Sequence, residues 1–412
     1  MTDAAAAAGD GAGGPDAGPA GLAGLPGRTR DFIREHVLAV DDEFDGDIAA
    51  AGGEALRVRL QDRARDAGLL APHAPVEYGG LGLNMTQRAA VFEEAGYSLF
   101  GPAALNIASP DEGNVHLLAQ VATAAQRERF LRPLVAGQTR SSFAMTEPSP
   151  GAGSDPSALR TSAARVDGGW LINGHKWFIT GADGAGFFIV IARTSGSPGD
   201  PGGATMFLVP ADRDGVTVLR HVTTIDKSML GGHCEMTFTD VFAADDEVLG
   251  GVDEGLRYAQ VRLGPARMTH VMRWGGAARR AHEAAVSHVA GREAFGARLA
   301  DLGMVQQMIA DNEIDLAATR ALLMVACAEL DAGSRASKST SIAKAFAGDA
   351  LNRVADRAVQ MCGGAGVSRD LPIAKIAREL RPFRIYDGPT EVHRWSLARR
   401  AIREIAGPAA RP

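Results

Sequence analysis

The spacing of apolar residues divides the 412-residue chain into three regions. Between residues 26 and 142 the apolar positions recur at helical spacing, as in TRDFIREHVLAVDDEF, which predicts a domain of amphipathic helices. Between residues 143 and 254, short apolar runs alternate with turns rich in Gly and Pro, which predicts a β domain. Between residues 255 and 412 the helical pattern returns in longer segments.

The middle region contains five segments of strand length: WLINGHKWFITG, GFFIVIART, ATMFLVP, GVTVLRHV and EMTFTDVFA. The first is predicted to form a hairpin, because Asn173-Gly174 between two apolar alternations is a strong turn signal. Together these segments predict a small, antiparallel, barrel-like β domain.

The last region is predicted to be an antiparallel four-helix bundle, because long amphipathic segments are separated by short breaks. The breaks fall near Arg298, near Gly333 and in CGGAGVSRDLP. In IDLAATRALLMVA, six apolar residues form one stripe at helical spacing: Ile314, Ala317, Ala318, Ala321, Leu322 and Val325. The predicted fold class is therefore α+β, with an N-terminal helical domain, a middle β domain and a C-terminal bundle.

Composition and charge narrow the function classes. A net charge of -6 gives no attraction to nucleic acid or to an anionic membrane, and no apolar run reaches the ~20 residues that a membrane helix needs. Cys234, Cys327 and Cys362 lack metal-binding or disulfide spacing, so we expect no metal site and a cytoplasmic location. Residues 1–25 are rich in Ala, Gly and Pro, which predicts a poorly ordered leader without a targeting signal.

Several segments carry candidate chemistry, although each has an ordinary structural explanation by itself. FAMTEPSPGAGSD is either a domain linker or a loop whose backbone can approach an anionic or planar ligand. KWFITG is typical of a β core, and QMCGGAG of a helix end followed by a glycine loop. RIYDGPTEVHR holds Asp387 before a Gly-Pro pair that favours a helix start, so Asp387 is either a base or part of a helix terminus. The chain has no GxxxxGK loop and no GxGxxG after a strand, which disfavours a Rossmann dinucleotide site.

In combination these segments resemble the acyl-CoA dehydrogenase family of flavoproteins. The matching pieces, in order, are YGGLGL, MTEP with GAGSD, KWFITG, REAFG with QQMIAD, QMCGGAG and IYDGPTEVHR. The resemblance covers roughly residues 28–406 and agrees with the three-part organisation. The nearest branch is the one that contains vertebrate acyl-CoA dehydrogenases fused to kinase-like domains, since SPDEGN, CGGAGVS and the Asp loop are similar to its signatures.

The resemblance implies FAD bound between the β domain and the bundle, with part of the pocket supplied by a neighbouring subunit. The matching cofactor positions within one chain are Phe143, Met145, Thr146, Ser154, Phe178, Thr180 and Glu391. The positions expected to complete a partner's FAD pocket are Arg292, Phe295, Gln306, Gln360 and Gly364. Asp387 becomes the catalytic base and Arg267 the arginine that supports its loop. The substrate positions are Ser154, Leu263 and Gly388.

The implied reaction is removal of an α-proton from an acyl thioester while a β-hydride moves to the flavin, which gives the 2-enoyl thioester. Three features depart from the common pattern. Asp387 replaces Glu and is one methylene shorter, Pro389 replaces a Thr that contacts FAD, and TEPSPGAGSD is two residues longer than usual, which leaves open which of residues 149–153 meets the flavin. We also expect Asp387 to have a raised pKa when an acyl chain buries it.

Two other functions remain open. An Asp base also occurs in fold relatives with changed chemistry, such as nitroalkane oxidases, and a flavin monooxygenase is a further variant of that alternative. A non-catalytic flavin-binding scaffold is the third hypothesis. Expected partners are an acyl-CoA or carrier-bound thioester, an electron-transfer flavoprotein and further copies of the chain in a homodimer or homotetramer. The length and substitution of the acyl group do not follow from the sequence.

Overall fold

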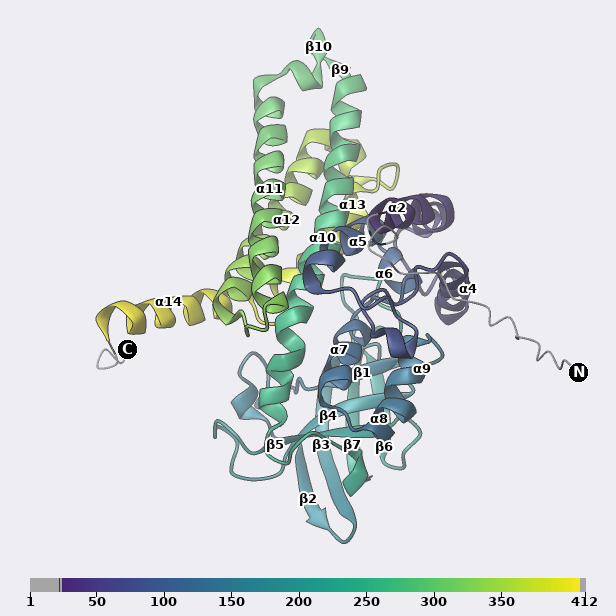
Figure 1. Cartoon of the computed structure of the whole chain (residues 1–412). Coiled ribbons are helices and arrows are strands. Elements are labelled where there is room, and N and C mark those ends of the chain that lie inside the picture. The colour runs from purple at the N-terminus through teal and green to yellow at the C-terminus, as the bar shows by residue number, and fades with distance from the viewer. Residues whose placement is uncertain (1–21, 23, 408–412) are drawn as a thin grey trace, which may run out of the picture.

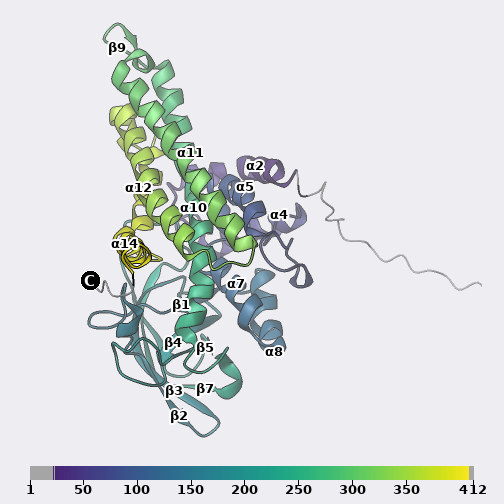
Figure 2. The ribbon, with the colours of Figure 1, turned by 60° about the vertical axis from the view of Figure 1, so that its left-hand side comes forward.

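The computed structural model describes residue 22 and residues 24–407, and the predicted leader therefore lies almost entirely outside the described residues. Figures 1 and 2 show the β domain at one end, a long helical bundle extending from it, and the N-terminal helices packed beside their junction. The order helical, β, helical confirms the predicted fold class.

The N-terminal region contains short and medium helices with one face buried. They are α2 (Leu25–His36), α3 (Leu38–Glu43), α4 (Gly53–Asp66), α5 (Met85–Gly96), α6 (Gly101–Ala104), α7 (Asp111–Val121), α8 (Ala124–Gln126) and α9 (Arg132–Val135). α5 begins with a capping box in which Asn84 and Gln87 bond to each other's backbone N–H groups. Helices α2 to α6 share one hydrophobic core with the C-terminal bundle, whereas α7 and α9 pack in a second cluster with the sheet.

The middle domain is one eight-stranded sheet with the strand order β6-β7-β3-β2-β4-β5-β8, and β1 pairs in parallel with β4. The strands are β1 (Ser141–Ala144), β2 (Ser162–Val166), β3 (Gly169–Thr180), β4 (Phe187–Arg193), β5 (Ala204–Pro210), β6 (Val216–His221), β7 (His233–Ala244) and β8 (Val248–Leu249). β4 is buried along its full length, and this places the central strands between two hydrophobic clusters.

The predicted hairpin at Asn173-Gly174 is wrong. β3 continues through both residues as a single strand, with a register shift against β7 at this point. A type I′ turn needs positive φ at both central residues, and neither residue has it. Asn173 instead exchanges two hydrogen bonds of 2.9 Å with Asp240 on β7, and a Cβ at position 174 would collide with Thr161. The Asn-Gly pair therefore serves a β-bulge.

The bundle consists of α10 (Gly255–Gly291), α11 (Gly303–Asp331), α12 (Ser337–Cys362), α13 (Ile373–Leu380) and α14 (Thr390–Ala406). A small hairpin, β9 (Glu293–Ala294) and β10 (Ala297–Arg298), lies at the end of the bundle farthest from the sheet. The predicted stripe on α11 does not face the chain's own core, since Ile314 is 64% and Val325 56% exposed. The inward face of α11 instead carries Asp315, which bonds to Arg353 on α12 at 2.6 Å.

Helix α10 connects all three regions and carries most of the site. A Cβ at Gly96 on α5 would collide with the backbone of Arg273 on α10, and Gly276 meets α5 in the same way, so glycine allows the two helices to touch. Nearby, the buried Asp41 accepts hydrogen bonds from Arg280 at 2.9 Å and Lys375 at 2.8 Å. These contacts fix the N-terminal helices against the bundle.

Candidate active site

Asp387 lies in the turn that precedes α14, and its backbone is held by three side chains. Its φ of +54° is left-handed, and the next residue, Gly388, has a φ of +92°. Arg267 Nε donates to the carbonyl of Asp387 at 2.9 Å, and His393 Nε2 lies 3.3 Å from the same oxygen. Lys344 Nζ donates to the carbonyl of Gly388 at 2.7 Å. The turn is therefore fixed on both sides of the carboxylate.

The carboxylate of Asp387 is largely shielded, with 18% of its side chain exposed. Its Oδ2 atom makes no hydrogen bond to a described residue, although His270 Nε2 lies 3.3 Å away. Burial by itself raises the pKa of Asp387, but His270, Arg262 and Arg267 outweigh it and hold the pKa below its usual range. Asp387 is thus ionised at neutral pH in the protein without a ligand, and the raised pKa expected when an acyl chain buries it stays a prediction.

His270 is a neutral imidazole with a defined tautomer. Burial and the neighbouring Arg273 lower its pKa, and Arg273 Nη2 donates to its Nδ1 at 3.0 Å. Since a guanidinium only donates, Nδ1 must be the acceptor and the proton must be on Nε2, which faces Asp387. The centre of the His270 ring lies 4.8 Å from that of Tyr386, and the two ring planes are inclined by 54°.

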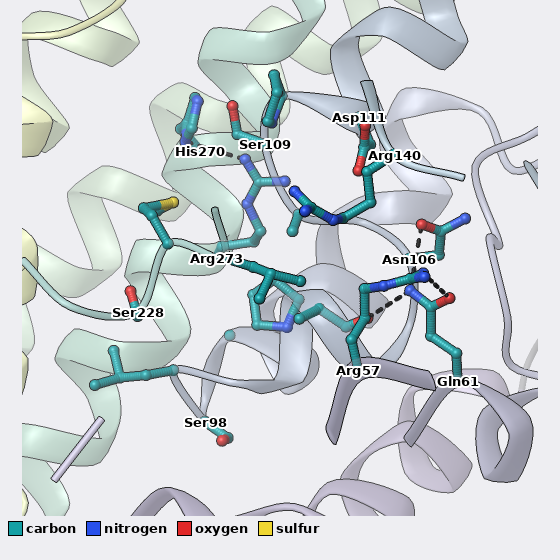
Figure 3. A pocket seen from close by; sticks show the side chains of 18 of the residues that line it. Arg57, Gln61, Ser98, Asn106, Ser109, Asp111, Arg140, Ser228, His270 and Arg273 are labelled. Atoms are coloured by element: carbon teal, nitrogen blue, oxygen red, sulfur yellow. Dashed lines mark hydrogen bonds between the residues drawn. The ribbon is translucent and has the colours of Figure 1, made fainter. Parts of the chain in front are cut away.

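A cavity of about 60 Å³ lies beside this group, between α10, the segment before α7 and residues 228–230. Figure 3 shows the guanidinium of Arg273 between His270 and Ser109. The lining is mainly apolar but also contains ten polar or charged residues: Arg57, Gln61, Ser98, Asn106, Ser109, Asp111, Arg140, Ser228, His270 and Arg273.

The β domain contributes the residues that were predicted to meet the flavin. Phe143 on β1 lies beneath Arg262, whose guanidinium carbon is 4.2 Å from the ring centre. Phe178 on β3 is 42% exposed and has a φ of +50°, and Thr180 ends the same strand. Thr146 accepts a hydrogen bond from the backbone of Trp177 at 3.0 Å, which joins the loop after β1 to β3.

A buried ion pair fixes the TEPSPGAGSD loop. Lys176 Nζ lies 3.0 Å from Glu147 Oε1 and also donates to the carbonyl of Met145 at 2.9 Å. Burial lowers the pKa of Lys176 to about 8, against the opposing effect of Glu147. The Glu147 carboxylate accepts from the backbone N–H groups of Ala152 at 3.1 Å and Thr161 at 2.8 Å, which closes the longer loop on itself. Ser154 is exposed at its end.

Thr180 belongs to a three-residue hydrogen-bond chain. Its Oγ1 lies 2.9 Å from His233 Nδ1, and His233 Nε2 lies 2.8 Å from Asp226 Oδ2. Burial by itself raises the pKa of Asp226, but the bond to His233 outweighs it and the pKa is lowered, so Asp226 is an acceptor. In neutral His233 the proton is therefore on Nε2, and Thr180 donates to Nδ1. The lone pairs of the Thr180 hydroxyl remain free.

The structure separates the predicted site residues into two groups. Asp387, Arg267, Leu263 and Gly388 lie around the junction of α10 and α14. By contrast, Arg292 and Phe295 lie at the far end of the bundle, where Phe295 is 94% exposed at the tip of the β9–β10 hairpin. The other residues of this distal group are also exposed: Gln306, Gln360 and Gly364. Glu391 is exposed on the first turn of α14 and faces Arg384 at 3.7 Å.

Sequence reasoning missed the buried cations and imidazoles of the site. Lys344 and His270 occur in no motif quoted above, and each reaches Asp387 or its turn through contacts between elements that are distant in the chain. His393 lies within IYDGPTEVHR, but the motif did not indicate its contact with the carbonyl of Asp387. The segment SIAKAFAGD around Lys344 reads as an ordinary amphipathic helix. A lysine among small apolar residues is the one signal that could have indicated burial.

Comparison with known proteins identifies the class of protein. Models of the acyl-CoA dehydrogenase N-terminal, middle and C-terminal domains match residues 25–138, 142–241 and 253–402. The chain therefore belongs to the acyl-CoA dehydrogenase family of oxidoreductases.

Individual relatives of the chain support the same family assignment. The chain is 37% identical to a Mycobacterium tuberculosis protein described as a probable acyl-CoA dehydrogenase, FadE2, over 90% of this chain and 93% of that protein. It is 33% identical to acyl-CoA dehydrogenase family member 11 of Gallus gallus, over 90% of this chain but 49% of the longer relative. The structure of butyryl-CoA dehydrogenase from Megasphaera elsdenii superposes with a TM-score of 0.82 at 27% identity, over 93% of this chain and 98% of that one.

The described residues contain neither a metal-binding cluster nor a membrane-spanning helix. Residues 24–407 contain no group of three or more His, Cys, Asp or Glu side chains placed to hold a metal ion. Among the same residues, no helix has both the length and the apolar character that crossing a bilayer requires.

Proposed function

We propose that the protein catalyses FAD-dependent α,β-dehydrogenation of an acyl-CoA, or of another acyl thioester, with Asp387 as the base. The observation that carries this proposal is the Oδ2 atom of Asp387, an ionised and shielded carboxylate oxygen without a hydrogen bond to a described residue. A base must have a free lone pair and a fixed direction. Arg267, His393 and Lys344 supply the fixed direction by holding the backbone on either side.

The backbone of the same turn is suited to polarise the thioester carbonyl. The N–H group of Asp387 donates to no acceptor in the described part of the chain, so it is free to bind the oxygen on which charge develops. Oxyanion donors of this kind are worth about 3–4 kcal/mol each. Proton removal by Oδ2 and stabilisation by the N–H would thus come from one residue, Asp387.

The residues of the β domain fit a flavin. Phe178 offers a half-exposed aromatic face beside Thr180, and Arg262 brings a buried positive charge over Phe143. Phe143, Met145, Thr146 and Thr180 would line the isoalloxazine, together with Ser154 at the mouth of the site. When bound, FAD would supply the hydride acceptor. The remaining contacts, Arg292, Phe295, Gln306, Gln360 and Gly364, would belong to the FAD of a neighbouring subunit, because their exposed positions are far from Asp387 in their own chain.

A homo-oligomer is part of this proposal. The exposed apolar stripe of α11, with Ile314 and Val325, and the exposed Trp395 and Ile405 on α14 offer surfaces for further copies of the chain. The reduced flavin would pass its electrons to an electron-transfer flavoprotein. This assembly explains why apolar residues at helical spacing on α11 face outward.

Anaerobic flavin bleaching tests the proposal. Purified wild type should be yellow and should bleach on addition of a suitable acyl-CoA. Asp387→Asn should keep its flavin and lose about 10²–10⁴-fold in bleaching rate, while Asp370→Asn, an exposed control, should match wild type. Bleaching of Asp387→Asn at the wild-type rate contradicts the assignment. Bleaching by a nitroalkane with rapid reoxidation in air would favour the oxidase or monooxygenase alternative, which the Asp base keeps open.

A further inference from the structure

The cavity beside Asp387 contains one arginine that lacks a carboxylate partner. Arg57 and Arg140 also line this cavity, and both pair with Glu54, the second at 3.0 Å. Arg273 is 5% exposed, and no Asp or Glu oxygen of the described residues lies within 4.0 Å of its guanidinium. Glu112 is the acid with the largest effect on the pKa of Arg273. Its Oε2 accepts a hydrogen bond from Thr269 at 2.8 Å, and its Oε1 has no hydrogen-bond partner among the described residues.

Much of the hydrogen-bonding capacity of Arg273 is also unused. Nη1 donates to the carbonyl of Ile107, and Nη2 donates to His270 Nδ1 at 3.0 Å. A guanidinium has five N–H groups, so further donors, including Nε, have no partner among the described residues. Figure 3 places these donors in the cavity, between His270 and Ser109. A buried charge without a partner is costly, and an anion that enters the cavity removes that cost.

The cavity is next to the proposed reaction centre. His270 lines the cavity and at the same time places its Nε2 3.3 Å from Asp387 Oδ2. Asp387 itself does not line the cavity, so an acyl group whose α-carbon is at Asp387 would reach Arg273 if its chain passes the ring of His270. A plain alkyl chain would cover the guanidinium and Ser109 without satisfying them, whereas a carboxylate matches the planar fork of an arginine.

We propose that the substrate is an acyl thioester with a carboxylate on its acyl chain, and that Arg273 binds this carboxylate. The inference rests on the proposed dehydrogenation and adds the class of acyl group. Arg273 is thereby a specificity-determining residue, and Ser109 is placed to donate a further hydrogen bond.

The test compares acyl-CoA pairs of equal chain length on the flavin-loaded protein. Glutaryl-CoA is paired with valeryl-CoA, and 5-hydroxyvaleryl-CoA is the neutral polar control. Wild type should bleach at least about 30-fold faster at low concentration with glutaryl-CoA than with either other compound, and should bind it correspondingly more tightly by calorimetry. Arg273→Met should remove this preference, so that the ratio of the glutaryl-CoA rate to the valeryl-CoA rate falls to about one. Its rate with valeryl-CoA should also fall, because Arg273 orients His270, and the ratio is therefore the readout. Arg273→Lys keeps the charge but lacks the planar guanidinium, so its preference for glutaryl-CoA should lie between those of wild type and Arg273→Met.

Arg257→Met is the matched control, since Arg257 is an exposed arginine on the same helix and pairs with Glu254 at 2.9 Å. It should retain the wild-type preference. Equal or better use of valeryl-CoA or 5-hydroxyvaleryl-CoA by wild type overturns the inference and leaves dehydrogenation intact. Failure of every acyl-CoA to bleach wild type overturns the proposed function itself. If Arg273→Met does not fold, the substrate preferences of wild type and of Arg273→Lys decide whether Arg273 binds a carboxylate.

Discussion

His270 Nε2 lies 3.3 Å from the unpartnered Oδ2 of Asp387, and the neutral ring is oriented by Arg273 on its other side. The imidazole thus presents an N–H to the base without adding a full charge. It stabilises the carboxylate while leaving the oxygen able to accept a proton. The relationship makes His270 a positioning residue for Asp387.

Replacement of His270 should change the pH profile of flavin reduction. Burial raises the pKa of Asp387 and His270 opposes this, so His270→Phe should raise that pKa. Because the base acts when ionised, the acidic limb of the rate profile should move to higher pH, with the largest loss of rate at low pH. His36→Phe on α2 is the control. An unchanged acidic limb, with flavin still bound, contradicts the assigned role.

Lys344 should be essential for the turn that carries the base. Its Nζ donates to the carbonyls of Phe383 at 2.9 Å and Gly388 at 2.7 Å, and burial lowers its pKa to about 8. Lys344→Met would leave both carbonyls without this donor, at a cost of about 1–3 kcal/mol in unfolding free energy. We expect a lower thermal midpoint and slower bleaching. Lys338→Met, on an exposed part of the same helix, should change neither.

The Glu147–Lys176 pair should contribute to stability only as a pair. The two side chains are 2% and 0% exposed, so removal of one partner leaves a buried charge. Glu147→Gln or Lys176→Met alone should lower the unfolding free energy by about 3–5 kcal/mol in urea titrations, and the double variant should lose less than the sum. The His175–Glu235 pair, in which His175 is 43% exposed, should show much weaker coupling in the same measurement. Strictly additive losses for Glu147 and Lys176 would contradict this.

Asp226 should influence the potential of the bound flavin through Thr180. When Asp226 accepts the Nε2–H of His233, His233 Nδ1 accepts a hydrogen bond from the Thr180 hydroxyl, and Thr180 can then only accept a hydrogen bond from the flavin edge. That edge gains an N–H on reduction, so Thr180→Val should lower the midpoint potential measured by spectroelectrochemistry. Asp226→Asn should lower it in the same direction, and Asp183→Asn should not. If the midpoint potential shifts in Thr180→Val but not in Asp226→Asn, Asp226 does not act on the flavin through Thr180, and the prediction is contradicted.

The order of domains and the positions of β3 to β7 could be predicted because both follow from the period of apolar residues, although β3 was expected as a hairpin. The short strands β1, β2 and β8 were not predicted. The turn at Asn173-Gly174 could not, since its outcome depends on Asp240 from a strand far along the chain. Asp387 and Arg267 were found through a short motif, which reports the local turn. Lys344 became part of the site only through tertiary contacts; its small apolar neighbours in the sequence could indicate burial but not the carbonyls that it contacts.

The left-handed backbone at position 387 also limits which base the site can use. Asp tolerates positive φ better than most residues because its short side chain can bond locally, and the left-handed Gly388 that follows leaves little freedom to relax the turn. A Glu at this position would bring its carboxylate closer to the ring of His270 and would add the backbone strain of a longer side chain, of order 1–3 kcal/mol. The shorter base is therefore matched to its turn, and lengthening the base in an engineered variant would require redesign of the turn as well.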